Sequence, residues 1–239
     1  FGNLFYSILT KFNLVKRVLF LWLAVLLMLP SVMRAQSTTL TVADGTDRNN
    51  HLPIYGLYLD YTGHNQVIYP ESMLVDMLGA TISSITFYME TVPTTPWAHT
   101  FEFGLGTTTT SNFSDENLIT TGISTVYTGT ISVNSQFTVT FTTPFVYNGG
   151  NLVLDVQNIA GGYSGGYFYG TTTSQAAGIY SYVSSYGSET IYNQTFIPKT
   201  TFTYSGGATC LLPSSLQISG ISANAATFSW TPRGTENSW

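Results

Sequence analysis

The sequence predicts an all-β fold for residues 36–205, an antiparallel β-sandwich of the jelly-roll type with one short helix. Three observations support this prediction. Thr, Ser, Gly, Tyr, Val and Ile, which favour strands and turns, dominate the stretch, whereas Lys, Arg and Glu are scarce. About a dozen short runs alternate between apolar and polar residues. Turn residues separate most of these runs, as they do in sandwiches and barrels.

The expected strands follow one another along the chain. They cover 39–42, 54–61, 66–69, 81–89, 101–105, 124–131, 137–141, 145–147, 152–156, 167–169, 179–183 and 200–204. Runs 124–131 and 137–141 are expected to pair. Residues 148–150, Asn-Gly-Gly, favour a hairpin between 145–147 and 152–156, because Asn-Gly supplies the positive φ angles of a tight turn.

The segment Glu71–Gly79 differs from its surroundings. Met73, Leu74, Met77 and Leu78 recur with the spacing of one helical face, and a glycine that can stop a helix follows them. We therefore expect one short helix here, covering one end of the sandwich.

The N-terminus has the pattern of a secretory signal peptide at residues 1–35. Three basic residues precede Val18–Leu29, an uninterrupted apolar run of 12 residues, and Ala35 provides a small residue before the cut. The alternative, a retained membrane helix, needs about 20 apolar residues. The pattern predicts a secreted or cell-surface protein without a membrane span in its mature form, which begins near Gln36.

Charge argues against a nucleic-acid partner. The whole chain has seven basic and twelve acidic residues, and four of the basic ones precede Gln36. The mature chain would then have a net charge of −9, which gives little attraction for nucleic acid or anionic membranes.

The composition changes after a linker at 206–213. Residues 214–239 contain a short strand after a proline, then an alternating strand that ends in Ser229-Trp230. This order resembles the start of a fibronectin type III domain, of which only an incomplete fragment would be present. The alternative is a terminal strand pair of the first domain. Cys210, alone in the chain, is a candidate partner for a cysteine outside this sequence.

Residues 41–204 also resemble a known group of proteins. The landmarks that carry the resemblance are 42–46, 53–56, 68–70, 82–88, 149–152, 168–170 and 198–204. They resemble the N-terminal β-sandwich of large secreted multidomain surface proteins of anaerobic Gram-negative bacteria. The resemblance implies a location and an architecture, with fibronectin type III modules following. It implies no active residues.

Candidates for catalysis are few. His51, His64 and His99 each lie in or beside a polar stretch without metal-ligand spacing, which favours exposed loop histidines. Among the twelve acids, Asp155 and Glu102 lie within strand runs opposite their apolar neighbours, so we expect them on an outward face. No nucleophile motif is present, and we therefore predict that the fragment is not an enzyme.

An oxygen-rich loop follows the first expected strand. Asp44, Asp47 and Asn49 could supply three oxygen ligands to a structural Ca²⁺, although Arg48 opposes a cation. The alternative is an Asx-type turn. No other cofactor is expected.

Seven of the 16 tyrosines lie between residues 161 and 192. Tyrosine rings stack on sugars and pack against protein partners, but they are also common in ordinary strands. The candidate ligand-binding residues are Tyr163, Tyr167, Tyr169, Tyr180, Tyr182 and Tyr186. If Phe168 anchors its strand in the core, the tyrosines on either side of it face solvent together.

These observations favour a secreted, non-catalytic binding or adhesion module for an extracellular glycan or protein ligand. Neutral glycans fit best, because few cations are available to bind an anionic polymer. Two alternatives stay open. One is an accessory domain of a larger secreted hydrolase, a peptidase or glycosidase whose catalytic part lies outside this sequence, and the other is a structural spacer.

Overall fold

The computed structural model describes residues 37–54, 62–94, 97, 100–159, 165–183, 189–207 and 214–231. The expected signal peptide at 1–35, Cys210 and most of the expected strand at 54–61 lie outside the described residues. Within these ranges, no helix is long and apolar enough to cross a membrane.

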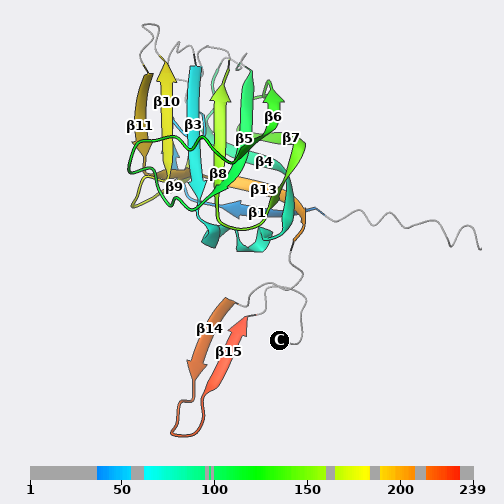
Figure 1. Cartoon of the computed structure of the whole chain (residues 1–239), viewed down its shortest axis with the longest axis vertical. Coiled ribbons are helices and arrows are strands. Elements are labelled where there is room, and N and C mark those ends of the chain that lie inside the picture. Colours follow the sequence, from blue (N-terminus) through cyan, green and yellow to red (C-terminus); the bar gives the residue numbers. More distant parts are fainter. Residues whose placement is uncertain are drawn as a thin grey trace, which may run out of the picture. The chain divides into compact units, whose positions relative to one another are not determined.

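The described strands form an antiparallel β-sandwich, as predicted (Figure 1). One sheet has six described strands in the order β11 (Glu189–Gln194), β10 (Gly178–Val183), β3 (Thr62–Tyr69), β8 (Asn151–Asn158), β5 (Phe101–Thr108) and β6 (Ile123–Gly129). The other has seven, β1 (Thr38–Val42), β13 (Thr200–Gly206), β4 (Ala80–Thr91), β9 (Tyr167–Thr172) and β12 (Phe196–Pro198), with β2 (Asp47–Asn49) beside β9 and β7 (Gln136–Tyr147) beside β4.

The strand order is that of a jelly roll. Eight strands, β1, β3, β4, β5, β6, β7, β8 and β13, are taken here in chain order as first to eighth. One sheet then reads first, eighth, third, sixth, and the other reads second, seventh, fourth, fifth. This is the arrangement of two interleaved Greek keys. The remaining strands extend the sheets, β10 and β11 beyond β3, and β9, β12 and β2 beyond β4.

The main core lies between the two sheets. Alternate residues of the six-stranded sheet point into it, such as Phe101, Phe103 and Leu105 of β5, which the alternation predicted to share a face. From the seven-stranded sheet come Ile82, Ile85 and Phe87 of β4, Phe137 and Val139 of β7, and Phe202 of β13.

A bulge explains the irregular spacing in β4. Ile82 and Ile85 both face the core although they are three residues apart. The pairing register shifts between Ile82 and Ser84 along β7, and at the same level along β13. The extra residue, Ser83, therefore resets the alternation so that the apolar residues on both sides of it stay buried.

Three local predictions were wrong. Residues 71–79 form two short 3₁₀ turns, η1 (Glu71–Met73) and η2 (Val75–Met77), instead of one helix. The expected hairpin across 148–150 does not form, because β7 and β8 belong to different sheets. The expected pairing of 124–131 with 137–141 does not form either, since β6 and β7 also lie in different sheets.

A covering segment, residues 109–122, lies on the outer face of the six-stranded sheet. In Figure 1 this green stretch, which follows β5, crosses in front of the strands. Its Phe113 is fully buried against Ile68, Val153 and Ile179, which point away from the main core. A Cβ on Gly104 would come within 2.5 Å of the Ile123 side chain, so glycine permits the close approach here.

The C-terminal strands β14 (Ser214–Ser219) and β15 (Thr227–Thr231) form an antiparallel hairpin. Among the described strands they pair only with each other. Apolar side chains of this hairpin, including Leu216, Phe228 and Trp230, are exposed. The hairpin matches the two expected strands, and its assignment to a fibronectin type III domain stays a prediction.

Candidate ligand-binding surface

The structure separates the candidate tyrosines into two groups. Tyr163 and Tyr186 lie outside the described residues. Phe168 of β9 is buried in the main core, as predicted, so Tyr167 and Tyr169 share the outer face of the seven-stranded sheet. Both are half-buried, and the Arg48 guanidinium lies 5.3 Å from the centre of the Tyr167 ring.

Tyr180 and Tyr182 lie on the other sheet, on its core-facing side. Tyr180 is directly opposite Asn65 of β3, and Asn65 shares its face with the core residue Val67. On the other side Tyr180 pairs with Tyr192 of β11. We call Tyr180, Tyr182 and Tyr192 the tyrosine cluster.

The rings of the tyrosine cluster are nearly parallel. Their centres are 5.3 to 6.5 Å apart and their planes differ by 12° to 28°. Tyr180 is buried, Tyr182 is half-buried, and Tyr192 is 45% exposed. The exposure of the rings therefore increases across the cluster, from the buried Tyr180 to Tyr192, which is open to solvent.

A histidine supports the buried side of this cluster. The His51 ring stacks on Tyr180 with centres 4.4 Å apart. The segment that carries His51 is fixed because Asn49 Oδ1 accepts hydrogen bonds from the backbone N–H groups of His51, at 2.7 Å, and Leu52, at 3.0 Å. Asn65 Nδ2 also donates to the His51 carbonyl, at 2.5 Å.

The tyrosine hydroxyls influence one another electrostatically. Burial, followed by the neighbouring Tyr192 and Tyr182, raises the pKa of Tyr180 to about 12. The Tyr180 hydroxyl is therefore neutral near neutral pH. Burial also lowers the pKa of His51, which favours its neutral form. The surface offers aromatic faces and neutral polar groups, which suit an uncharged, hydroxyl-rich ligand.

Each of the three expected calcium ligands contacts another protein group. Asp44 forms an ion pair with Lys199. Asp47 Oδ2 accepts from the Thr172 backbone N–H at 2.8 Å, and this bond holds the pKa of Asp47 below its usual value. Asn49 forms the Asx-type turn described above. The described part of the chain contains no group of three or more His, Cys, Asp or Glu placed to hold a metal ion. Calcium binding stays a prediction that a titration can test.

The expected catalytic candidates have structural partners. His64, expected in an exposed loop, is a half-buried residue of β3, and its Nε2 lies 2.5 Å from Asp155 Oδ1. Asp155 points to the outer face as predicted, but only 4% of it is exposed. Its oxygens also accept from Gln66 Nε2 at 2.6 Å and Gln157 Nε2 at 3.1 Å.

This network anchors the covering segment. The Gln66 side chain forms two hydrogen bonds with the backbone of Ile119, accepting from its N–H at 2.8 Å and donating to its carbonyl at 2.7 Å. The other outward acid, Glu102, accepts a hydrogen bond from Thr125 at 2.9 Å. His99 lies outside the described residues.

Sequence reasoning missed two members of this surface. Tyr192 was counted among the clustered tyrosines but was not placed with the candidate ligand-binding residues, and His51 was interpreted only as a loop histidine. If strands 178–183 and 189–194 are paired as a hairpin, Tyr192 lies opposite Tyr180. The spacing in the sequence could therefore have identified Tyr192. The contact with His51 joins distant parts of the chain and leaves no local signal.

No family model, no curated protein and no solved structure matches this chain.

Proposed function

We propose that this chain is a secreted, non-catalytic module that binds neutral glycans, with the tyrosine cluster as its main contact surface. The observation that carries the proposal is the convergence of three nearly parallel tyrosine rings from two paired strands, with Tyr192 exposed. Sugar rings stack their axial hydrogens on such aromatic faces, while the phenol hydroxyls provide hydrogen bonds.

A binding role is favoured over catalysis because the two acids within strands that were considered for catalysis, Asp155 and Glu102, have structural partners. Asp155 is buried beneath the covering segment and holds three side chains in place. A glycosidase needs two carboxyl groups that flank an accessible bond. A protein ligand at the same aromatic surface, an accessory role beside a hydrolase and a spacer role stay the alternatives.

Alanine substitutions in the tyrosine cluster test the proposal. The double variant Tyr182→Ala/Tyr192→Ala removes the two more exposed rings and leaves Tyr180 in place. Each stacking ring contributes about 1–2 kcal/mol, so binding on an array of neutral glycans should weaken at least tenfold. Thermal unfolding, measured in parallel, should change little because Tyr192 is exposed and Tyr182 is only half-buried, so neither side chain belongs to the main core.

The matched control is Tyr167→Ala/Tyr169→Ala, which removes two half-buried tyrosines from the other sheet. This control should keep glycan binding. Full binding by the cluster variant would contradict the proposal. Loss of binding in the control alone would place the platform at Tyr167 and Tyr169, as the sequence also allowed.

A further inference from the structure

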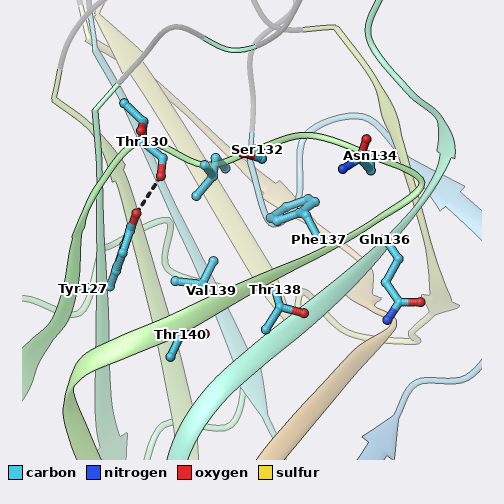
Figure 2. Close-up of a pocket in the computed structure, with 10 residues that line it drawn as sticks. Tyr127, Thr130, Ser132, Asn134, Gln136, Phe137, Thr138, Val139 and Thr140 are labelled. Atoms are coloured by element: carbon cyan, nitrogen blue, oxygen red, sulfur yellow. Dashed lines mark hydrogen bonds between the residues drawn. The ribbon is translucent and has the colours of Figure 1, made fainter.

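A second concave site lies at the opposite edge of the six-stranded sheet from the tyrosine cluster. The cluster is on β10 and β11, and this pocket begins at β6, the other edge strand. Its volume is about 380 Å³, within the range of small-molecule sites. It is lined by Tyr127, Thr130, Ile131, Ser132, Asn134, Gln136, Phe137, Thr138, Val139 and Thr140 (Figure 2).

The pocket lies along the edge of β7. Five consecutive residues, 136–140, line it, although successive side chains of a strand point to opposite faces. Residues on both faces of the strand can line one pocket only if the pocket lies beside the edge of the strand. No described strand pairs with this edge, because β7 forms a ladder only with β4.

The hydrogen-bond pattern shows which backbone groups face the pocket. The Met89 N–H donates to the Ser135 carbonyl at 2.8 Å, directly beyond the paired residues Tyr88 and Gln136. In an antiparallel ladder every second residue bonds to the neighbouring strand. Ser135, Phe137 and Val139 therefore bond toward β4. The N–H and C=O groups of alternate residues, Gln136, Thr138 and Thr140, point to the free edge.

The protein's own chain bounds the pocket at both ends. At one end β6 and β7 meet, and Thr142 Oγ1 donates to the Val126 carbonyl at 3.1 Å. At the other end the connection between these strands arches over the space (Figure 2). The Tyr127 hydroxyl donates to the Thr130 carbonyl at 2.5 Å and so fixes this wall. An extended peptide could not continue along β7 past these ends, whereas a compact ligand fits.

The lining is uncharged and rich in hydrogen-bonding groups. Seven of its ten side chains carry a hydroxyl or an amide, and the other three, Ile131, Phe137 and Val139, belong to the main core. Sugar hydroxyls both donate and accept, so they match free N–H and C=O groups alike. We propose that this pocket binds a mono- or disaccharide unit of a neutral glycan. The site is separate from the tyrosine cluster and does not depend on it.

Amide chemical shifts of the full chain test this proposal directly. The probes are neutral sugars, namely glucose, galactose, mannose, N-acetylglucosamine, cellobiose and lactose. Each is added to about 50 mM, a concentration that occupies even a site with a millimolar dissociation constant. At least one of them should shift the amides of Gln136, Thr138 and Thr140. If none does, the proposal is wrong.

Two matched variants separate this site from others. Ser132→Trp places a large side chain in the pocket and should weaken sugar binding at least tenfold. Ser135→Trp lies on the same connection but outside the lining, and it should bind as the parent chain does. Asn134→Ala, a milder change, provides a second test if Ser132→Trp does not fold. Sugar-induced shifts that survive both pocket variants would overturn the proposal.

The same measurement distinguishes the other outcomes. Tyr182→Ala/Tyr192→Ala should leave the shifts at β7 intact, so that failure of one site does not imply failure of the other. A mixture of uncharged heptapeptides that shifts the β7 amides, while the sugars do not, would overturn the sugar assignment in favour of strand addition.

Discussion

The two outer faces of the sandwich differ in what they carry. On the seven-stranded sheet the outer face has hydroxyls that bond across strands, such as Thr86 with Thr138 and Thr41 with Thr201, each pair at 2.7 Å. On the six-stranded sheet the outer face has isoleucine and valine beneath the covering segment, 109–122. One sheet therefore contributes to a single hydrophobic core, and the other contributes to two.

This difference shows what the apolar–polar pattern of a strand indicates about the burial of its two faces. In β7 the pattern Phe137-Thr138-Val139-Thr140 alternates strictly, and it indicates one buried face. In β3 and β8, Val67-Ile68-Tyr69 and Leu152-Val153-Leu154 are apolar without interruption. A continuous apolar run indicates a strand that is covered on both faces. Three predictions test whether the covered face stabilises the fold more than the uncovered one.

The largest effect is expected for Phe113→Ala. Phe113 is the fully buried side chain with which the covering segment fills the second core. Removing a buried phenylalanine typically lowers the free energy of unfolding by about 3–5 kcal/mol. Urea unfolding checks this value, and Phe113→Leu should lose much less. A loss below about 1 kcal/mol would mean that the segment opens independently of the sandwich.

A smaller effect, with a distinct pH dependence, is expected for Asp155→Asn. Burial raises the pKa of Asp155, but the hydrogen bond and charge of His64, with Gln66 and Gln157, outweigh it and hold the pKa below its usual value. A lowered pKa stabilises the folded state above the unfolded pKa, and this stability is lost as the pH falls through the folded value. The variant should lose about 1–3 kcal/mol near neutral pH.

The pH profile of unfolding provides the check on this prediction. Below about pH 4 the parent chain should lose stability more steeply than Asp155→Asn, which has no carboxylate to protonate at this position. Equal slopes in the two proteins would show that the buried network does not stabilise the covered face.

The smallest effect is expected on the uncovered face, for Thr86→Val with Thr138→Val. The two hydroxyls bond to each other, so their coupling in a double-mutant cycle should be about 0.5–1 kcal/mol. Thermal unfolding of both single variants and the double variant measures it. A coupling above about 2 kcal/mol would remove the contrast between the two faces.

The sequence predicted the sandwich because composition and alternation are local properties. Gly149 and Gly150 have positive φ angles but Asn148 does not, so the chain turns at 148–150 without the Asn-Gly turn that was expected. What failed was the pairing across that turn, because a turn signal does not specify whether the next strand joins the same sheet. The helix at 71–79 was wrong because the apolar spacing of this segment does not require a continuous helix. The ten residues between β3 and β4 form two 3₁₀ turns, in which Met77 is the buried methionine.

The candidate binding surface was predictable only in part. Alternation correctly placed Phe168 in the core and Tyr180 with Tyr182 on one face. It could not indicate that these two pairs of tyrosines belong to different sheets. That outcome depends on long-range register, as do the contact between His51 and Tyr180 and the pocket beside β7.

The pairing of β1 with β13 has a mechanical consequence. Thr38 at the start of β1 lies opposite Tyr204 near the end of β13, so the chain enters and leaves the sandwich at the same end of one ladder. A force that pulls these two points apart would break the hydrogen bonds of that ladder one after another, as a zipper opens, and would not shear them together. Under tension along its chain the module should therefore begin to yield at β1 and at low force, which single-molecule stretching between residues 37 and 207 can measure.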